Sequence, residues 1–133
     1  MDRRRVLAFG LASAVLPAAA SSASTGEQNS GPVKLIAIYD RPDDTTAFFE
    51  HYEAVHAPLV KRTPGLQSFV LNRVTDDLLG GEPAYVLIAE MTYPDRATFE
   101  AAMKSPENAA AGQDLMSFAK GKVRVLVADC TLA

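Results

Sequence analysis

Four short runs of β-branched and other apolar residues recur along the chain, and they predict four strands. These runs cover residues 33–39, 67–74, 84–92 and 122–129, and polar or glycine-rich segments separate them. The segment at residues 76–83, between the second and third runs, contains Gly80-Gly81 and predicts a mobile hairpin loop. The chain is therefore expected to build a small sheet.

A first helix is predicted between the first two strands. Within residues 46–56, Phe48 and Tyr52 fall at helical spacing, and one of residues 43–45 is expected to cap the start of the helix. Pro58 disfavours helical geometry in the residue before it, so the regular helix is expected to end near His56.

A second helical region is predicted between the third and fourth strands. It begins after Asp95, restarts at Ser105-Pro106 and ends at Gly121, and the pattern leaves open whether it is one helix or two. The element order is then βαββαβ, which is the ferredoxin-like α+β pattern with a four-stranded antiparallel sheet. Both crossovers are expected to place their helices on the same face of that sheet.

The second face of the predicted sheet needs a cover of its own. Residues 35–38, 86–89 and 125–128 are apolar on both sides of their strands, whereas a face in contact with water alternates apolar and polar residues. The helices cover only one face, and no further segment of the chain is left for the other. We therefore expect a symmetric homodimer joined through the sheets.

The N-terminus has the pattern of a targeting segment. Three arginines at positions 3–5 precede an uncharged apolar stretch at 6–16 and a run of small residues, which is typical of an export signal over residues 1–23. The arginines resemble a twin-arginine motif, and cleavage is expected after Ala20 or Ala23. Residues 24–32 are expected to form a flexible tether ahead of a domain at 33–133, with the mature protein periplasmic or secreted. The alternative is an uncleaved anchor helix.

Composition narrows the class of protein further. The chain has 133 residues, is 48% hydrophobic and has a net charge of −3, which excludes a disordered chain. Removal of residues 1–23 makes the net charge −5, which disfavours nucleic acid and anionic membranes as partners. Cys130 is the only cysteine, so a disulfide scaffold is excluded. Its thiol is expected to be packed in the core, to form an intermolecular bridge, or to be reactive.

The chain contains two histidines, of which His56 is the candidate for chemistry. It follows Tyr52 by four residues on one helical stripe, near the predicted helix end. That end and the nearby Glu53 both favour an imidazolium, so His56 is a candidate general acid or base beside an apolar pocket. The alternative is a histidine that caps the helix. His51 lies off this stripe and is expected to be a solvated surface residue.

Other residue patterns carry less chemistry. Two histidines and one cysteine without paired spacing predict no metal site, and no phosphate-binding loop or nucleophile elbow is present, so no cofactor is expected. Tyr39 is typical of a core or interface tyrosine. Asn72, at the end of the second strand, either polarises a substrate carbonyl or makes an end-of-strand hydrogen bond.

Several motifs together resemble the EthD family, named for ethyl tert-butyl ether degradation. The most specific are His56-Ala57-Pro58-Leu59 and the following Pro64-Gly65-Leu66, with Asn72-Arg73-Val74 behind them. The resemblance extends from residue 33 to about residue 130. It implies a dimeric α+β barrel and an association with the oxidative breakdown of small organic compounds, while similar barrels host cofactor-free monooxygenases, lactone isomerases and haem proteins.

The resemblance also suggests residue roles by position. The recurrent histidine of the family falls on His56, its strand-one tyrosine on Tyr39 and its strand-two asparagine on Asn72. We therefore expect His56 to be catalytic in proton transfer and Tyr39, Tyr52 and Asn72 to bind the substrate.

Three hypotheses of function follow from these residues. The first is an exported EthD-domain enzyme, an oxidoreductase-associated protein or a cofactor-free oxidoreductase or isomerase, acting on a small apolar, oxygen-bearing compound. The second is a non-catalytic periplasmic carrier of a hydrophobic ligand, favoured because no second strong acid or base is evident beside His56. The third is a haem-binding barrel with His56 as ligand.

Overall fold

The structure is a computed structural model that describes residues 31–133. In chain order the elements are β1 (Val33–Asp40), α1 (Thr45–His51), a π-helical turn η1 (Tyr52–His56), α2 (Ala57–Lys61), β2 (Ser68–Arg73), β3 (Tyr85–Tyr93), α3 (Arg96–Met103), α4 (Pro106–Ala119) and β4 (Val123–Asp129). The export signal expected at residues 1–23 and most of the tether expected at 24–32 lie outside the described residues.

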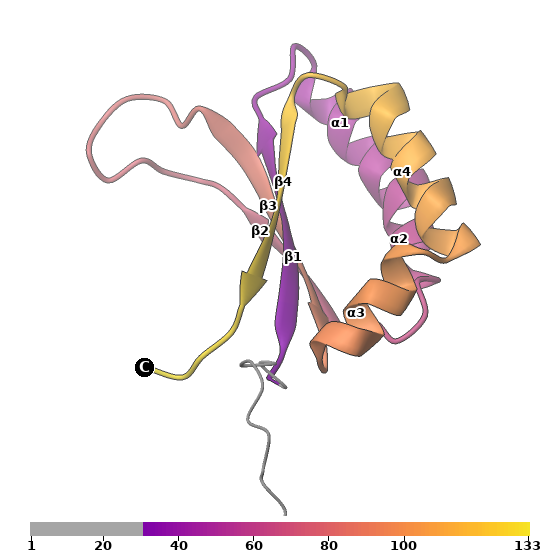
Figure 1. The fold of residues 1–133 in the computed structure, drawn as a ribbon. Coiled ribbons are helices and arrows are strands. Elements are labelled where there is room, and N and C mark those ends of the chain that lie inside the picture. The colour runs from indigo at the N-terminus through magenta and orange to yellow at the C-terminus, as the bar shows by residue number, and fades with distance from the viewer. Residues whose placement is uncertain (1–30) are drawn as a thin grey trace, which may run out of the picture.

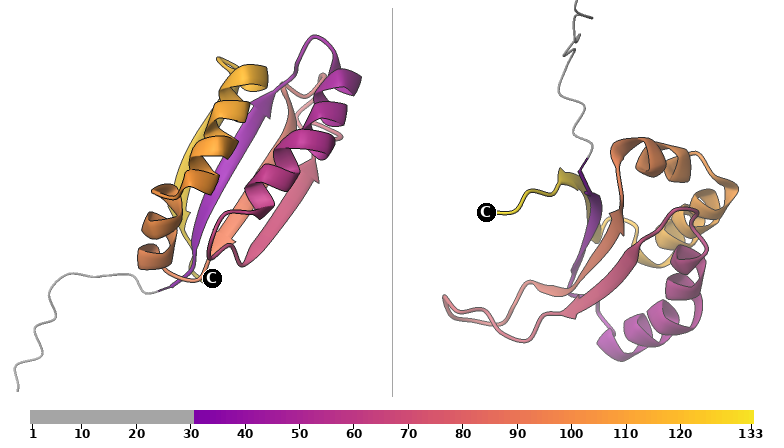
Figure 2. Two further views of the ribbon diagram at one scale, coloured as in Figure 1. Left: turned by 90° about the vertical axis from the view of Figure 1, so that its right-hand side faces the viewer. Right: turned by 90° about the horizontal axis from the view of Figure 1, so that it is seen from below.

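The four strands form one antiparallel sheet in the order β2-β3-β1-β4. All helices of the described part lie on one side of this sheet, the right-hand side in Figure 1. The two turned views show α1 and α4 running side by side across it (Figure 2). The predicted ferredoxin-like βαββαβ fold is confirmed, and each predicted strand lies within about one residue of its observed bounds.

The helix starts follow the predicted caps. The Asp44 carboxylate accepts a hydrogen bond from the Ala47 amide at 3.0 Å, and Asp95 accepts one from Thr98 at 2.7 Å. Ser105 caps α4 ahead of a proline, so the second helical region is two helices. At its other end Gly121 adopts a φ of +78°, which permits the sharp exit from α4.

The first helical region is longer than the sequence predicts. The expected end near His56 is wrong, because helical geometry continues through η1 and α2 to Lys61. Ala57 keeps helical angles, φ −58° and ψ −43°, although Pro58 follows it, and its amide donates to the Tyr52 carbonyl five residues back. Ala57 and Val60 are buried in the core, and this burial outweighs the steric preference of a residue before proline.

Gly65 follows α2 in a conformation that explains one part of the sequence motif. Its φ is +79°, a left-handed value that glycine adopts without steric cost. A Cβ atom at this position would also overlap the side chain of Thr98. The motif glycine is therefore required both by the turn and by the close approach of α3.

The two faces of the sheet differ in exposure. On the face under the helices, Tyr39, Leu87 and Tyr93 are almost completely buried. The edge strands are exposed on both faces: Val125 of β4 is 45% exposed on the helix side, and Val70 of β2 and Leu126 of β4 are 47% and 52% exposed on the opposite side. No helix within residues 31–133 has the length and apolar character needed to cross a membrane. Cys130, after β4, is half-buried.

Candidate active site

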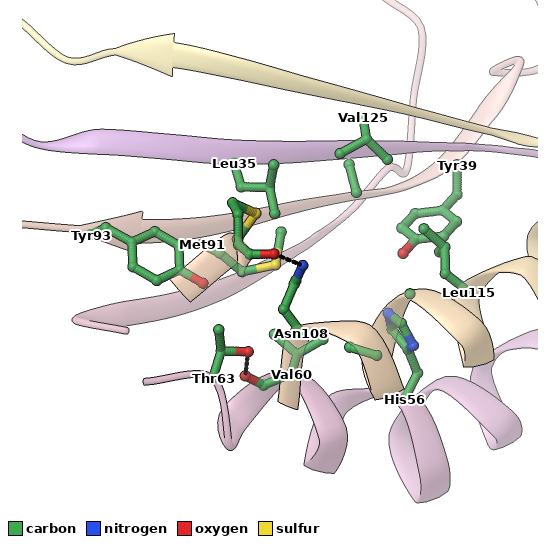
Figure 3. A pocket seen from close by; sticks show the side chains of 14 residues that line it. Leu35, Tyr39, His56, Val60, Thr63, Met91, Tyr93, Asn108, Leu115 and Val125 are labelled. Carbon is green, nitrogen blue, oxygen red and sulfur yellow. Dashed lines mark hydrogen bonds between the residues drawn. The ribbon is translucent and has the colours of Figure 1, made fainter. Parts of the chain in front are cut away.

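A cavity of about 210 Å³ lies between the buried face of the sheet and the helices α2 and α4. Tyr39 and His56 lie at one end of the cavity, Thr63 and Tyr93 lie at the other, and Asn108 lies between them (Figure 3). The rest of the wall is apolar and includes side chains from the strands and both helices: Leu35, Val60, Met91, Leu115 and Val125. The cavity is therefore suited to a small, mostly apolar molecule with polar atoms at its ends.

His56 is fixed in orientation by a carboxylate from α4. Its Nδ1 lies 2.9 Å from Oδ2 of Asp114, and its side chain is only 5% exposed. A carboxylate only accepts hydrogen bonds, so the proton of a neutral His56 ring is on Nδ1. The lone pair then lies on Nε2, for which the described residues supply no hydrogen-bond partner, and His56 lines the cavity. A carboxylate that fixes an imidazole tautomer is the arrangement used to prepare a general base.

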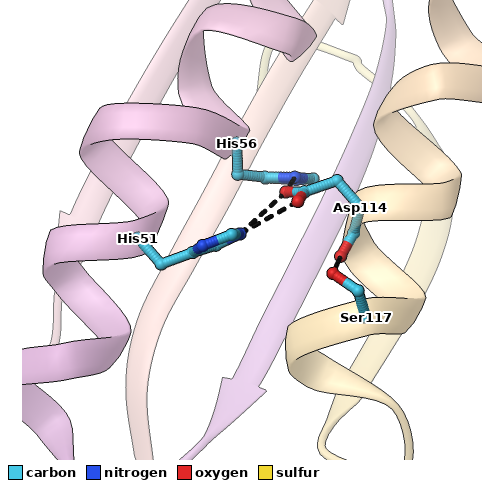
Figure 4. A network of polar contacts seen from close by, with 4 residues as sticks. All are labelled: His51, His56, Asp114 and Ser117. Carbon is cyan, nitrogen blue, oxygen red and sulfur yellow. Dashed lines mark hydrogen bonds and ion pairs between the residues drawn. The ribbon is translucent and has the colours of Figure 1, made fainter.

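His51 reaches the same carboxylate from the other side. Its Nε2 lies 2.9 Å from Oδ1 of Asp114, so one carboxylate joins both histidines (Figure 4). The His51 ring also packs against Phe118 with ring centres 4.7 Å apart. Its side chain is 34% exposed, so His51 is partly solvated, but the sequence did not predict its contact with Asp114.

The π-helical turn accounts for this convergence. In an α-helix, residues five apart point about 140° away from each other. In a π-helical turn the repeat is longer, so residues five apart lie on nearly the same side. The turn Tyr52–His56 therefore aligns His51 with His56, which regular helical spacing separates.

Burial sets the protonation states at this end of the cavity. It lowers the pKa of His56 below its ordinary value of 6.5, and the hydrogen bond and charge of Asp114 offset this only in part. Burial raises the pKa of Tyr52 to about 12, and it also raises the pKa of Tyr39. At neutral pH this end therefore presents an uncharged imidazole and uncharged phenols.

The direction of the His56 shift corrects the sequence-based argument. Helical geometry continues to Lys61, so His56 does not lie at a helix end and does not cap one. Glu53, expected to favour an imidazolium, instead pairs with Arg73 of β2, whose guanidinium stacks over the Phe49 ring. The group that favours a protonated His56 ring is therefore Asp114, and not the helix end or Glu53 as the sequence predicted.

The structure brings three of the four predicted site residues together. Tyr39 and His56 both line the cavity, and the Tyr52 ring packs between them with ring centres 5.5 and 5.1 Å away. Tyr52 is buried beside the cavity lining, and its hydroxyl makes no hydrogen bond to the described residues. It therefore supports the two rings from behind.

Asn72 lies elsewhere. It is on the exposed face of the sheet, and its amide donates to the Ile88 carbonyl and to Oε2 of Glu90 at 3.0 and 2.9 Å. Lys34 pairs with the other oxygen of Glu90. The sheet separates Asn72 from the cavity, so a substrate-binding role beside His56 does not fit its position, and the end-of-strand hydrogen bond is the alternative that the geometry supports.

Asp114 is the residue that sequence reasoning missed. It lies 58 positions after His56, so no local motif connects them. A signal was nevertheless present, because Asp114 interrupts the apolar stripe of Ala111, Leu115 and Phe118 on α4. An acidic residue on the buried face of a helix is rarely unpaired, and its side chain is only 12% exposed here. Within residues 31–133, no group of three or more His, Cys, Asp or Glu side chains is arranged to hold a metal ion.

Comparison with known proteins places this chain in a family. The family model for the EthD domain matches residues 42–122, which include both histidines and Asp114. The chain belongs to the EthD family.

Two relatives have clear sequence similarity. The chain is 33% identical over 96 residues to an uncharacterized 11.0 kDa protein in the thcB-thcC intergenic region of Rhodococcus erythropolis, covering 72% of this chain and 92% of that protein. The second relative is an ethyl tert-butyl ether degradation (EthD) family protein from Bacillus halodurans C-125, whose crystal structure is known and whose sequence is 37% identical to this chain. It aligns with a TM-score of 0.72 over 75% of this chain and 99% of that one.

A third structure is similar in fold alone. A mutant of SnoaB, a cofactor-independent oxygenase from Streptomyces nogalater, aligns with a TM-score of 0.57 at 18% identity. The alignment covers 77% of this chain and 95% of that one.

Proposed function

We propose that the protein is a cofactor-free enzyme in which His56 acts as a general base on a small, uncharged organic compound. The observation that carries this proposal is the contact between Nδ1 of His56 and Asp114 at the wall of the cavity. It prepares a neutral imidazole whose free nitrogen is available to a bound molecule. SnoaB, which has a similar fold, is a cofactor-independent oxygenase, so this kind of fold is compatible with chemistry that needs no cofactor.

The cavity limits the size of the compound. Its volume of about 210 Å³ exceeds the roughly 150 Å³ of a protein cavity that holds benzene. It is therefore adequate for one substituted ring or a short branched chain. Tyr39 at one end and Asn108 and Thr63 toward the other offer hydrogen-bonding groups, which favours a substrate with oxygen atoms at its ends.

The proposed step is a proton transfer. Nε2 of His56 takes a proton from an acidic C–H group next to a carbonyl, and the electron pair of that bond remains on the compound as an enolate. The imidazolium would be stabilised by Asp114 through the Nδ1 hydrogen bond, and Tyr39, which lines the cavity, would donate its hydroxyl proton to an enolate oxygen. Return of the proton to a different carbon completes an isomerisation, whereas oxidation requires dioxygen as co-reactant.

Deuterium exchange tests this step without knowledge of the natural substrate. The protein is incubated in D₂O with a panel of single-ring ketones and lactones, and loss of the proton beside the carbonyl is followed by NMR. At least one compound is expected to exchange about 10²–10⁴-fold faster with the unsubstituted protein than with His56→Ala. Glu100→Gln, on the exposed side of α3, is the matched control and should retain the full rate.

The same experiment separates the enzyme from a carrier. The argument for a carrier was the absence of a strong acid or base beside His56, and Asp114 removes that argument. Compounds that bind in the cavity but exchange at equal rates with the unsubstituted protein and His56→Ala would favour the carrier and contradict the proposal. The haem alternative predicts a Soret band after reconstitution, and a colourless protein under haem excess would dismiss it.

We also propose that the protein works as a homodimer. The sheet face opposite the helices carries exposed apolar side chains on both edge strands, Val70 and Leu126, and the half-buried Ile36 and Glu90 lie between them. A second copy packed against this face would remove these apolar side chains from water. Light scattering should report twice the subunit mass, and Leu126→Arg should halve it. Leu78→Arg, on the fully exposed β2–β3 loop, should not, and equal masses for all three proteins at one subunit would contradict the dimer.

Export to the periplasm or beyond is proposed from the arginine-rich start of the sequence and the small residues that follow it. An exported EthD-domain enzyme would meet its substrate outside the cytoplasm.

A further inference from the structure

His51, the second histidine bonded to Asp114, offers the site another ring that can hold a proton. The carboxylate is 12% exposed and receives a hydrogen bond from each ring, at 2.9 Å from Nδ1 of His56 and 2.9 Å from Nε2 of His51. A largely buried carboxylate with two neutral donors still carries a full negative charge, which is costly away from water. One additional proton on either ring would neutralise the array.

The two rings are not equivalent places for that proton. The His56 side chain is 5% exposed, whereas the His51 side chain is 34% exposed. Water solvates a positive charge on His51 far better than one on His56, so the desolvation cost favours His51. Of the two histidines, only His56 lines the cavity described above.

We propose that His51 is a positioning residue that carries the positive charge neutralising Asp114, so that His56 remains an uncharged base toward the cavity until substrate supplies its proton. This inference rests on the proposed role of His56. It adds that the basicity of the cavity histidine is controlled from the surface of the helix, through one shared carboxylate.

The other titratable groups around this array leave it undisturbed. From β1 and from η1 itself, Tyr39 and Tyr52 face His56, and burial keeps both phenols neutral by raising the pKa of each. From α4 only Asp114 contacts the rings with a charge, and Phe118 covers both of them. Glu53 is engaged by Arg73 of β2 on the exposed side.

Histidine NMR measures this directly, because the chain contains only two histidines and each variant assigns the remaining ring. His51→Gln removes the charge, and the proton-binding constant of His56 should rise by roughly three- to tenfold, since the two rings lie within about 8 Å of each other through the carboxylate. His51→Lys restores a positive charge, and the constant should return to the original value or below. Glu50→Gln, an exposed neighbour, is the control.

The opposite movements of the two variants distinguish charge control from packing. If His51 acted only through packing, the proton-binding constant of His56 would change in the same direction in both variants, and that result would overturn the inference. An unchanged constant in His51→Gln would overturn it as well. The unsubstituted protein provides a further arm that needs no folding of a variant. In it, Nε2 of His56 should still be unprotonated when the array has taken up its first additional proton, and a protonated Nε2 at that stage would overturn the inference.

The histidine titrations and the deuterium-exchange experiment can fail independently of each other. These titrations use no substrate, so failure of deuterium exchange leaves the coupling between the histidines standing. Conversely, uncoupled histidines with His56-dependent exchange would reject the role of His51 and retain His56 as the base.

Discussion

Replacement of Asp114 by asparagine isolates the interaction on which the candidate site depends. Asn has nearly the same shape, but it presents one acceptor oxygen and one donor amide in place of two acceptor oxygens. In the protein both oxygens of Asp114 receive hydrogen bonds, from His51 and His56. After the substitution one of the two rings must face an amide N–H and must change its tautomer or lose the contact.

The size of the effect follows from the geometry. A hydrogen bond to a charged group contributes about 1.5–3 kcal/mol, and the contact between Nδ1 of His56 and Oδ2 of Asp114 is a short one at 2.9 Å. Loss of the charge should therefore weaken proton binding by His56 roughly 10- to 100-fold. An imidazole with its proton on Nε2 has no lone pair toward the cavity, so the deuterium-exchange rate should fall by about 10²–10⁴-fold.

Two measurements follow the substitution, the tautomer of His56 by NMR and the exchange rate with a responsive compound. Ser117→Ala is the matched control, because the Ser117 hydroxyl donates to the main-chain carbonyl of Asp114 at 2.6 Å and leaves the carboxylate intact (Figure 4). If Asp114→Asn left both the tautomer and the exchange rate as they are in the unsubstituted protein, the reasoning from the carboxylate would be refuted.

Three further predictions address stability and export. Because burial lowers the pKa of His56, the folded state binds a proton at this ring less readily than the unfolded state does. The free energy of unfolding should therefore fall as the pH drops below about 6.5, by at most about 1.4 kcal/mol per pH unit more than in His56→Gln. Equal pH slopes for the two proteins in urea titrations would contradict this. Gly65→Ala should lower the free energy of unfolding by about 2–4 kcal/mol. Gly112→Ala, whose Cβ would meet no atom within 4 Å, should raise it by about 0.5–1 kcal/mol. Equal melting temperatures for the two variants would refute the structural role of Gly65. Lysines in place of Arg3 and Arg4 should retain the chain in the cytoplasm by cell fractionation, and undiminished export would reject the twin-arginine route.

The fold was predictable because its signals are local. Each strand is a run of β-branched and apolar residues, and the helix starts at Asp95 and Ser105 carry side chains that satisfy free amides within the same turn. The sequence pattern also predicted apolar residues on both faces of the strands, but the outer face combines Ile36 and Leu126 with the charged pair Lys34 and Glu90. The helix end near Pro58 was not predictable in this way, since the packing of Ala57 and Val60 against the core decides it.

The site was predictable only in part, because its contacts join distant segments. His56 and Tyr39 were found from their residue types and the family resemblance, and both line the cavity. The position of Asn72 depended on strand register, and a shift by one residue exchanges the two faces of a strand. The contact of His51 with Asp114 was missed because regular helical spacing does not anticipate a π-helical turn, and Asp114 comes from a helix 58 residues away.

The most direct test of the account is the protonation of the two ring nitrogens of His56 in the unsubstituted protein at neutral pH. Long-range ¹H–¹⁵N NMR distinguishes a protonated from an unprotonated ring nitrogen. The contact with Asp114 predicts a neutral ring with its proton on Nδ1 and a free lone pair on Nε2. A neutral ring protonated on Nε2, or an imidazolium at neutral pH, would contradict the assignment of His56 as the base.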